Sequence, residues 1–198
     1  MNIPRRIAIA SIAIAAVLPS AALAQAKPAA CRMKDNTVTV LMTTSMGPIT
    51  LLLDAKKAPA SADNFVKYVE AGFYNGTVFH RVIDGFMIQG GGFSKDLVQK
   101  PTNAPIKNEG ANGLKNEPYT IAMARTNMPD SATSQFFINV GENVMLDAVP
   151  PKPGYAVFGK VIDGKETVDK IRKVAVARTS VSEAQPLSPV VLEKVECL

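Results

Sequence analysis

The chain has 198 residues, enough for one domain with a substantial core. Its 13 glycines and 14 prolines suit a turn-rich β protein and argue against a disordered chain. The formal net charge is +5, but the sequence has no concentrated Lys/Arg patch interleaved with aromatic residues. The composition therefore argues against nucleic-acid binding.

The first 26 residues have the layout of a cleavable secretory signal. Arg5 and Arg6 precede an apolar stretch at 7–18, and small residues that suit cleavage follow at Ala24 and Ala26. The apolar stretch is shorter than the roughly 20 residues of a transmembrane helix, which disfavours the alternative of an uncleaved anchor. We therefore expect export by the general secretory route and no membrane attachment once the signal is removed.

Residues 27–35 are expected to form a flexible mature N-terminus. After them, Thr37–Thr44 alternates in polarity and is rich in β-branched residues, which predicts a strand. A turn is expected at 45–48, and Ile49–Asp54 is the expected returning strand. This hairpin opens the folded domain, which we place at 36–198.

A helix is predicted to follow the hairpin. Pro59 and Ser61 are its expected start, with Ser61 as the N-cap. Phe65 and Val69 follow at helical spacing, and Gly72 is expected to end the helix. The apolar stripe predicts packing against the core.

The stretch at 79–93 reads FHRVIDGFMIQGGGF and combines a cation, an amide, bulky apolar side chains and three glycines. If its two halves are strands joined by the Asp-Gly turn at 84–85, side chains alternate between faces. Met87 and Gln89 then share one face, which the turn can fold back towards Arg81. A guanidinium held by an amide beside an apolar surface suits an uncharged, apolar ligand with a carbonyl group.

The remaining chain predicts short strands separated by loops, with a long polar stretch at 94–118. A helix is expected at Lys165–Arg172. The expected strands are Thr120–Ala124, Gln135–Val140, Tyr155–Ile162 and Pro189–Val195. Short strands with only two helices fit a closed antiparallel barrel, because closure removes exposed strand edges. The lack of a long amphipathic helix favours a monomer.

Three ordered runs resemble signatures of the cyclophilin family of peptidyl-prolyl cis-trans isomerases. They are FHRVIDGFMIQGGGF at 79–93, SQFFIN at 134–139 and YAVFGKV at 155–161. The resemblance spans about residues 36–196 and implies a mainly-β fold, a closed eight-stranded antiparallel barrel capped by two α-helices. It also implies isomerase activity on Pro-containing unfolded or partly folded polypeptides. The chain is similar to exported bacterial members, which together with the signal sequence points to the periplasm.

The resemblance also assigns site residues. Arg81 would hydrogen-bond the substrate at the twisting prolyl amide, and Gln89 would orient Arg81 and contact the substrate backbone. The family's apolar proline pocket corresponds to Phe86, Met87, Phe136 and Leu146, whereas Phe137 is expected in the core because it alternates with Phe136. The other expected substrate contacts are Ala124, Arg125, Thr126, Gln135, Met145 and Tyr155.

Three of these positions depart from the family pattern. Arg125 stands where the family usually has Asn, so its backbone rather than its side chain is the expected peptide contact. Met145 replaces a Trp that many members carry, and Tyr155 replaces a His found in some. The missing indole N–H argues against tight binding of cyclosporin-type inhibitors.

The two cysteines, Cys31 and Cys197, lie near opposite ends of the chain. They lack C-x-x-C spacing, which argues against redox catalysis and a Cys-rich metal site. In cyclophilins the first and last strands are neighbours, so the resemblance implies a Cys31–Cys197 disulfide, with two free thiols as the alternative. Isomerisation breaks no bond, so we expect no metal and no cofactor.

Two other functions compete with isomerisation. A non-catalytic chaperone or peptide-binding module for Pro-containing chains would use the same pocket, but Arg81 and Gln89 favour catalysis. His80, the single histidine, is a candidate general base. No G-x-S-x-G motif accompanies it, so the sequence argues against a hydrolase.

Overall fold

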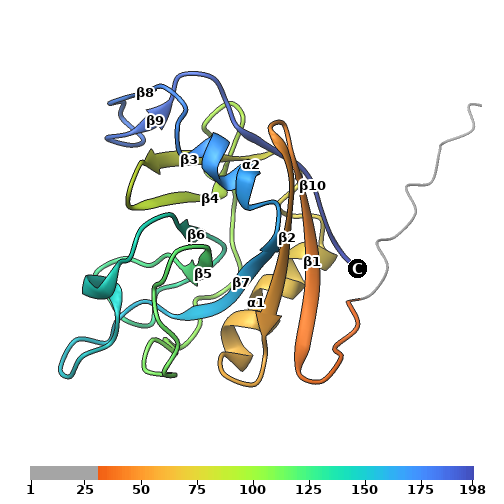
Figure 1. Cartoon of the computed structure of the whole chain (residues 1–198), viewed down its shortest axis with the longest axis vertical. Helices are drawn as coiled ribbons and strands as arrows, with labels where there is room; N and C mark the ends of the chain where they lie inside the picture. The colour runs from red at the N-terminus through yellow and green to blue at the C-terminus, as the bar shows by residue number, and fades with distance from the viewer. Residues whose placement is uncertain (1–30) are drawn as a thin grey trace, which may run out of the picture.

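The computed structural model describes residues 31–198, and the predicted secretory signal at 1–26 lies outside the described residues. Eight antiparallel strands close into a barrel in the order β1-β10-β3-β4-β6-β5-β7-β2, and two helices pack against it (Figure 1). The barrel strands are β1 (Thr37–Thr44), β2 (Gly47–Asp54), β3 (Thr77–Ile83), β4 (Met87–Ser94), β5 (Thr120–Met123), β6 (Phe136–Asn139), β7 (Val157–Asp163) and β10 (Val191–Cys197). The predicted fold is confirmed.

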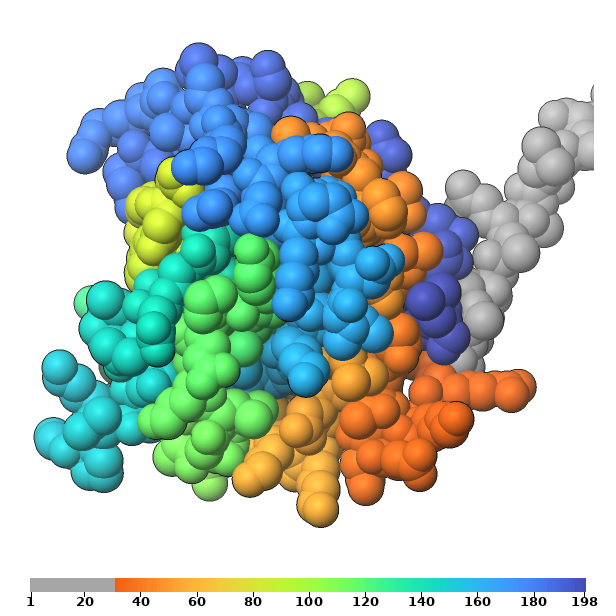
Figure 2. Space-filling view, in the orientation of Figure 1, coloured from red at the N-terminus to blue at the C-terminus, as the bar shows by residue number. Residues whose placement is uncertain are grey.

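The helices are α1 (Pro59–Glu70), α2 (Lys165–Ile171) and a short 3-10 helix, η1 (Val144–Leu146). A small sheet of β8 (Val176–Ala177) and β9 (Gln185–Pro186) was not expected from the sequence. Figure 1 shows it beside β3, at the upper end of the molecule. The loop that contains η1 projects from the surface in Figure 2.

The barrel interior is filled by the alternate residues of each strand. In β1 the buried positions include Val38, Val40 and Met42, as period-two alternation requires. Phe65 of α1 closes this interior, with its ring centroid 5.5 Å from that of Phe136 and 5.3 Å from that of Phe158. The apolar stripe of the helix therefore packs on the core, as expected.

The start of α1 differs from the prediction. The helix begins at Pro59, and Ser61 lies inside its first turn rather than at the N-cap. The free N–H groups of this turn are satisfied by Glu109, which accepts bonds from the Ala60 N–H (2.9 Å) and the Ser61 N–H (2.8 Å). The Ser61 hydroxyl donates to the same carboxylate. A distant carboxylate thus replaces the local cap, and it also suits the positive end of the helix dipole.

Two glycines of β4 allow side chains from β6, and from the residue that precedes β6, to pack directly on the strand. Gly91 has φ +80°, and a Cβ there would lie 2.8 Å from the Phe136 ring. A Cβ at Gly92 would lie 2.5 Å from the Gln135 side chain. The absence of side chains at these two glycines therefore lets the neighbouring chain approach β4 closely.

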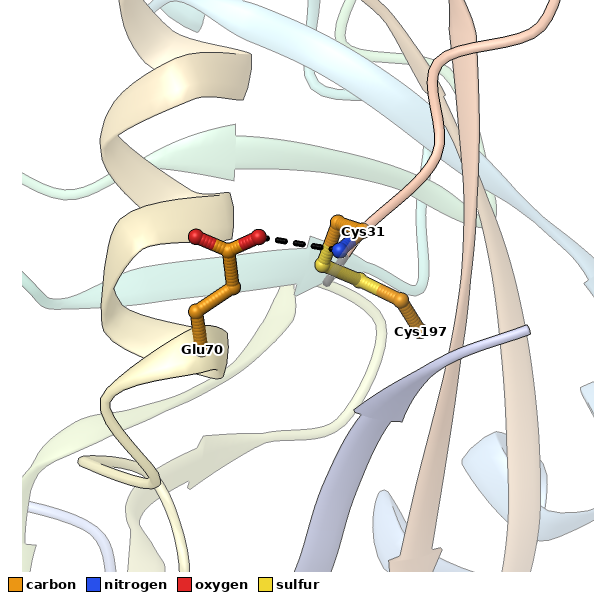
Figure 3. The surroundings of a disulfide bond; sticks show 3 residues. All are labelled: Cys31, Glu70 and Cys197. Atoms are coloured by element: carbon orange, nitrogen blue, oxygen red, sulfur yellow. Dashed lines mark hydrogen bonds between the residues drawn. A yellow bond between two sulfur atoms is a disulfide. The ribbon is translucent and has the colours of Figure 1, made fainter. Parts of the chain in front are cut away.

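Cys31 and Cys197 form a disulfide with a Cα–Cα distance of 5.2 Å (Figure 3). The Cys31 N–H also donates to the Glu70 carboxylate at the end of α1 (2.9 Å). On β10, Cys197 pairs with Val40 of β1. The expected disulfide is present, and it attaches the start of the described chain to both the last strand and the first helix.

None of the helices in residues 31–198 is long and apolar enough to cross a membrane.

The disulfide closes a loop with a sequence separation of 166 residues. Replacing Cys197 with Ser should lower the free energy of unfolding by up to about 5 kcal/mol, because the unfolded chain regains the entropy of an open loop. Urea unfolding with and without reductant measures this. The reductant should destabilise the wild type and leave the Cys31→Ser/Cys197→Ser double variant unchanged. Two reactive thiols in the denatured, unreduced protein would contradict the bond.

Candidate active site

One row of side chains crosses five strands on the outer face of the barrel. Arg81 of β3 lies opposite Gln89 of β4, and Gln89 lies opposite Phe137 of β6. Phe137 pairs with Ala122 of β5, which pairs with Val157 of β7. Directly opposed residues share one face of a sheet. The strand register therefore brings a cation, an amide and an apolar surface into one line.

The apolar part of this row belongs to a second cluster, separate from the barrel interior, which we call the outer apolar cluster. Its side chains are shielded from water to different degrees and come from several strands and from the loops between them. The buried members are Met87, Ala122, Phe137 and Val157, and the half-buried members are Ile83, Phe86, Leu114, Ala124, Leu146 and Tyr155. The Phe137 and Tyr155 rings meet edge to face, with centroids 5.7 Å apart. The cluster is thus partly open to a ligand.

The prediction that Phe136 lines the ligand pocket was wrong, whereas Phe137 is buried, as expected, but on the outer side of the sheet. Phe136 is fully buried in the barrel interior, where its ring lies 5.6 Å from Tyr74 and 6.0 Å from Phe79 between centroids. Phe137 instead belongs to the outer apolar cluster. Alternation was correctly predicted, but the faces were reversed, because Phe136 pairs with Gly90 and Phe137 with Gln89.

The Arg81 guanidinium is held on two sides. Its Nη1 donates to Gln89 Oε1 (3.3 Å) and approaches Met87 Sδ (3.5 Å). On the other side, Nε and Nη2 both lie close to Glu183 Oε1, at 2.8 and 2.7 Å. The side chain remains 27% exposed, so a ligand can reach it. Gln89 is fixed in turn, because its Nε2 donates to Gln135 Oε1 (2.9 Å).

The sequence predicted the contacts of Arg81 with Gln89 and Met87 but missed Glu183. Glu183 lies in the loop between β8 and β9, 102 residues from Arg81. No local pattern in the sequence predicts this pairing. The sequence shows only that Glu183 is acidic and does not show which cation it contacts.

The side chain of Arg125 is engaged within the protein. Its Nε and Nη2 donate to the Gly154 carbonyl (3.1 and 3.0 Å), and its guanidinium carbon lies 4.3 Å from the centroid of the Tyr155 ring. Neither the N–H nor the C=O of Arg125 is hydrogen-bonded within residues 31–198. The backbone at this position is therefore free to pair with a peptide. Thr126 is exposed, and its hydroxyl donates a hydrogen bond to the Ser131 hydroxyl (2.8 Å).

Of the η1 residues, Leu146 joins the outer apolar cluster, whereas Met145 is 66% exposed and does not. The structure thus does not bring Met145 into the apolar surface beside Arg81.

His80 is not suited to acid–base chemistry. It is 4% exposed and packs against Phe93, with ring centroids 4.7 Å apart. Burial, reinforced by the Arg81 charge, lowers the pKa of His80 to about 4. The imidazole, on β3, is therefore neutral at physiological pH and packs against Phe93 of β4. Within residues 31–198, no three His, Cys, Asp or Glu side chains are grouped so as to hold a metal ion.

Comparison with known proteins agrees with this geometry. Residues 39–197 match the family model described as cyclophilin type peptidyl-prolyl cis-trans isomerase/CLD. The chain is 56% identical over 159 residues to peptidyl-prolyl cis-trans isomerase A of Dickeya dadantii, covering 80% of this chain and 84% of that protein. It is 50% identical over 155 residues to peptidyl-prolyl cis-trans isomerase B of Escherichia coli, covering 77% and 94%.

The fold comparison points the same way. A cyclophilin-type isomerase of Cryptosporidium parvum, solved in the presence of the dipeptide Ala-Pro, superposes with a TM-score of 0.68 at 25% identity, covering 81% of this chain and 98% of that one. The family match spans most of the described residues, and it includes every element of the Arg81 row. The chain therefore belongs to the cyclophilin family of peptidyl-prolyl cis-trans isomerases.

Proposed function

We propose that this protein accelerates cis-trans isomerisation of Xaa-Pro bonds in exported polypeptides and so assists their folding. Arg81 is the proposed donor at the prolyl amide, and the outer apolar cluster is the proposed seat of the proline ring. The observation that carries the proposal is the Arg81 guanidinium, partly open to solvent and held beside this cluster by Gln89.

The chemistry requires stabilisation of a twisted amide and no bond cleavage. The uncatalysed barrier is about 20 kcal/mol and arises from amide resonance. A turnover of about 10³ s⁻¹ corresponds to a barrier of about 13 kcal/mol. The protein must therefore stabilise the transition state by roughly 7 kcal/mol more than the bound substrate.

A permanently charged donor suits this task. As conjugation is lost, the prolyl nitrogen regains a lone pair that can accept a hydrogen bond. Arg81 is always protonated and offers a rigid fork of N–H groups. Its partners fix the guanidinium before substrate arrives, so little reorganisation is needed at the transition state.

Clamping one side of the bond while the other rotates is the second requirement. The half-buried side chains of Phe86, Leu146 and Tyr155 offer apolar contact to the proline ring. The unpaired backbone groups of Arg125 suit an extended peptide beside it. The dipeptide Ala-Pro, in whose presence the Cryptosporidium parvum isomerase was solved, belongs to this chemical class of ligand.

Export to the periplasm is part of the proposal. It is supported by the layout of the first 26 residues and by the Cys31–Cys197 disulfide, which is typical of oxidising compartments. The bacterial origin of the two relatives is consistent with it.

Replacing Arg81 with Ala should lower kcat/KM for an Ala-Pro peptide by about 10²–10³-fold, because one preorganised donor is lost. Exchange NMR on the mature protein measures the rate. Arg172→Ala is the matched control, since Arg172 is also in an ion pair, with Asp84, and is 28% exposed against 27% for Arg81. If the wild type binds the peptide without accelerating exchange, a binding or chaperone role replaces catalysis.

The two phenylalanines should separate binding from stability. Phe137→Leu should lower kcat/KM by about tenfold, because an apolar contact worth about 1–2 kcal/mol to the proline ring is removed. Phe136→Leu should mainly lower the free energy of unfolding, by roughly 1–2 kcal/mol, because it leaves a gap in the barrel interior. Denaturant unfolding and kinetics per folded molecule test both. The reverse pattern would contradict the placement of the proline ring.

Processing should leave a mature chain that begins at Gln25 or Lys27, after cleavage behind Ala24 or Ala26. N-terminal sequencing of protein recovered from the periplasmic fraction of a bacterial host checks this. An unprocessed N-terminus in the cytoplasmic fraction would count against export.

A further inference from the structure

The β8–β9 loop contributes a carboxylate to the Arg81 row. Glu183 Oε1 accepts from Arg81 Nε at 2.8 Å and lies 2.7 Å from Nη2. This is the shortest polar contact that Arg81 makes among the described residues, since Gln89 lies at 3.3 Å. A charge-assisted bond at two donors constrains the guanidinium plane more than a single bond does.

The donor geometry shows what Glu183 leaves free. A guanidinium has five N–H groups, on Nε, Nη1 and Nη2. Glu183 occupies the edge formed by Nε and Nη2, while Gln89 and Met87 lie at Nη1. With Gln89 Oε1 and Met87 Sδ both at Nη1, one N–H group of the five, on Nη2, has no partner among the described residues and remains at the tip. Glu183 therefore binds one side of the guanidinium and leaves its tip available to a prolyl amide.

The backbone that carries Glu183 is well anchored. Its neighbours Ser182 and Ala184 are buried, and the Ala184 carbonyl accepts from the Val82 N–H of β3 (2.9 Å). The Ser182 carbonyl accepts from the Thr179 N–H (2.8 Å), which closes the preceding turn. Because β3 also contains Arg81, this bond fixes the loop relative to the strand on which the arginine lies.

The charges around Glu183 favour its ionised form. Hydrogen bonding to Arg81, together with its own backbone N–H, lowers the pKa of Glu183, and the Arg81 and Arg178 charges act in the same direction. Desolvation opposes this shift more weakly. The carboxylate is thus charged at neutral pH, when the proposed reaction takes place.

We propose that Glu183 is a positioning residue for the isomerase reaction, which holds the Arg81 guanidinium so that its tip faces the prolyl amide. The inference rests on the proposed function of Arg81. Glu183 does not touch the substrate in this scheme. It acts by reducing the orientations that Arg81 samples before the transition state forms.

The test compares Glu183→Gln and Glu183→Ala with the wild type. The control is Glu196→Gln, which removes a carboxylate from another exposed ion pair, with Lys194 at 2.8 Å on β10. Exchange NMR on an Ala-Pro peptide gives kcat and KM. We expect kcat to fall about threefold in Glu183→Gln, which keeps an acceptor oxygen, and about tenfold in Glu183→Ala. KM should change less than twofold, and Glu196→Gln should match the wild type.

A second readout follows the ion pair without reference to activity. In the wild type the Arg81 Nε–H should give a distinct, slowly exchanging NMR signal, because it is bonded to Glu183. The signal should shift and exchange faster in both Glu183 variants and stay unchanged in Glu196→Gln. Acidification should produce the same shift in the wild type only as pH falls below the ordinary carboxyl range, since the pKa of Glu183 is lowered.

Three outcomes overturn the inference. Unchanged kcat in Glu183→Ala with a lost Arg81 signal shows that the ion pair forms but does not position Arg81 for catalysis, while the proposed function stands. A rise in kcat shows that Glu183 competes with substrate for the arginine. A wild type that does not accelerate exchange removes the proposed function and this inference with it, even if the NMR signal reports the pair.

Discussion

The antiparallel pairing of β3, β4 and β6 decides which side chains of this barrel meet. Arg81 lies opposite Gln89, and Gln89 opposite Phe137, so polar and apolar groups share the outer face. The alternate residues of the same strands fill the interior. A shift of one residue in either pairing would move Arg81 or Phe137 to the other face. The register thus underlies both the stability of the core and the composition of the proposed site.

Local patterns in the sequence were sufficient for much of this arrangement. The Asp-Gly turn at 84–85 and the alternation on either side of it predicted that Gln89 and Met87 would face Arg81, and they do. Alternation also predicted that Phe136 and Phe137 point in opposite directions. It does not say which of two apolar side chains faces inward, because both faces of β6 are covered. Only the pairing of β6 with β4 resolves this, and that pairing joins distant parts of the chain.

The features that the sequence did not reveal are contacts between distant loops and regular elements. Glu109 caps α1 from 48 residues away, so Ser61 at the helix start suggested a local cap that does not exist. Glu183 reaches Arg81 from a small sheet of two-residue strands, which carry too little periodicity to be predicted. In both cases a carboxylate accepts hydrogen bonds from N–H groups of a distant segment, which are the first-turn backbone of α1 for Glu109 and the Arg81 guanidinium for Glu183. Such pairs depend on the closed barrel, which brings the loops to their partners.

The disulfide also determines how the barrel can open. Between β10 and β3 only Val191 and Leu192 are paired, whereas the pairing of β10 with β1 extends from Thr44 to Val40 and ends beside Cys197. A closed sheet separates most readily where its ladder is shortest. Because Cys31 precedes β1 and is bonded to Cys197 at the end of β10, the disulfide keeps β1 and β10 together if the barrel opens beside β3. Opening between β10 and β3 would free part of the edge of β3, the strand that carries Arg81, so the disulfide and the proposed site lie on opposite sides of the same seam.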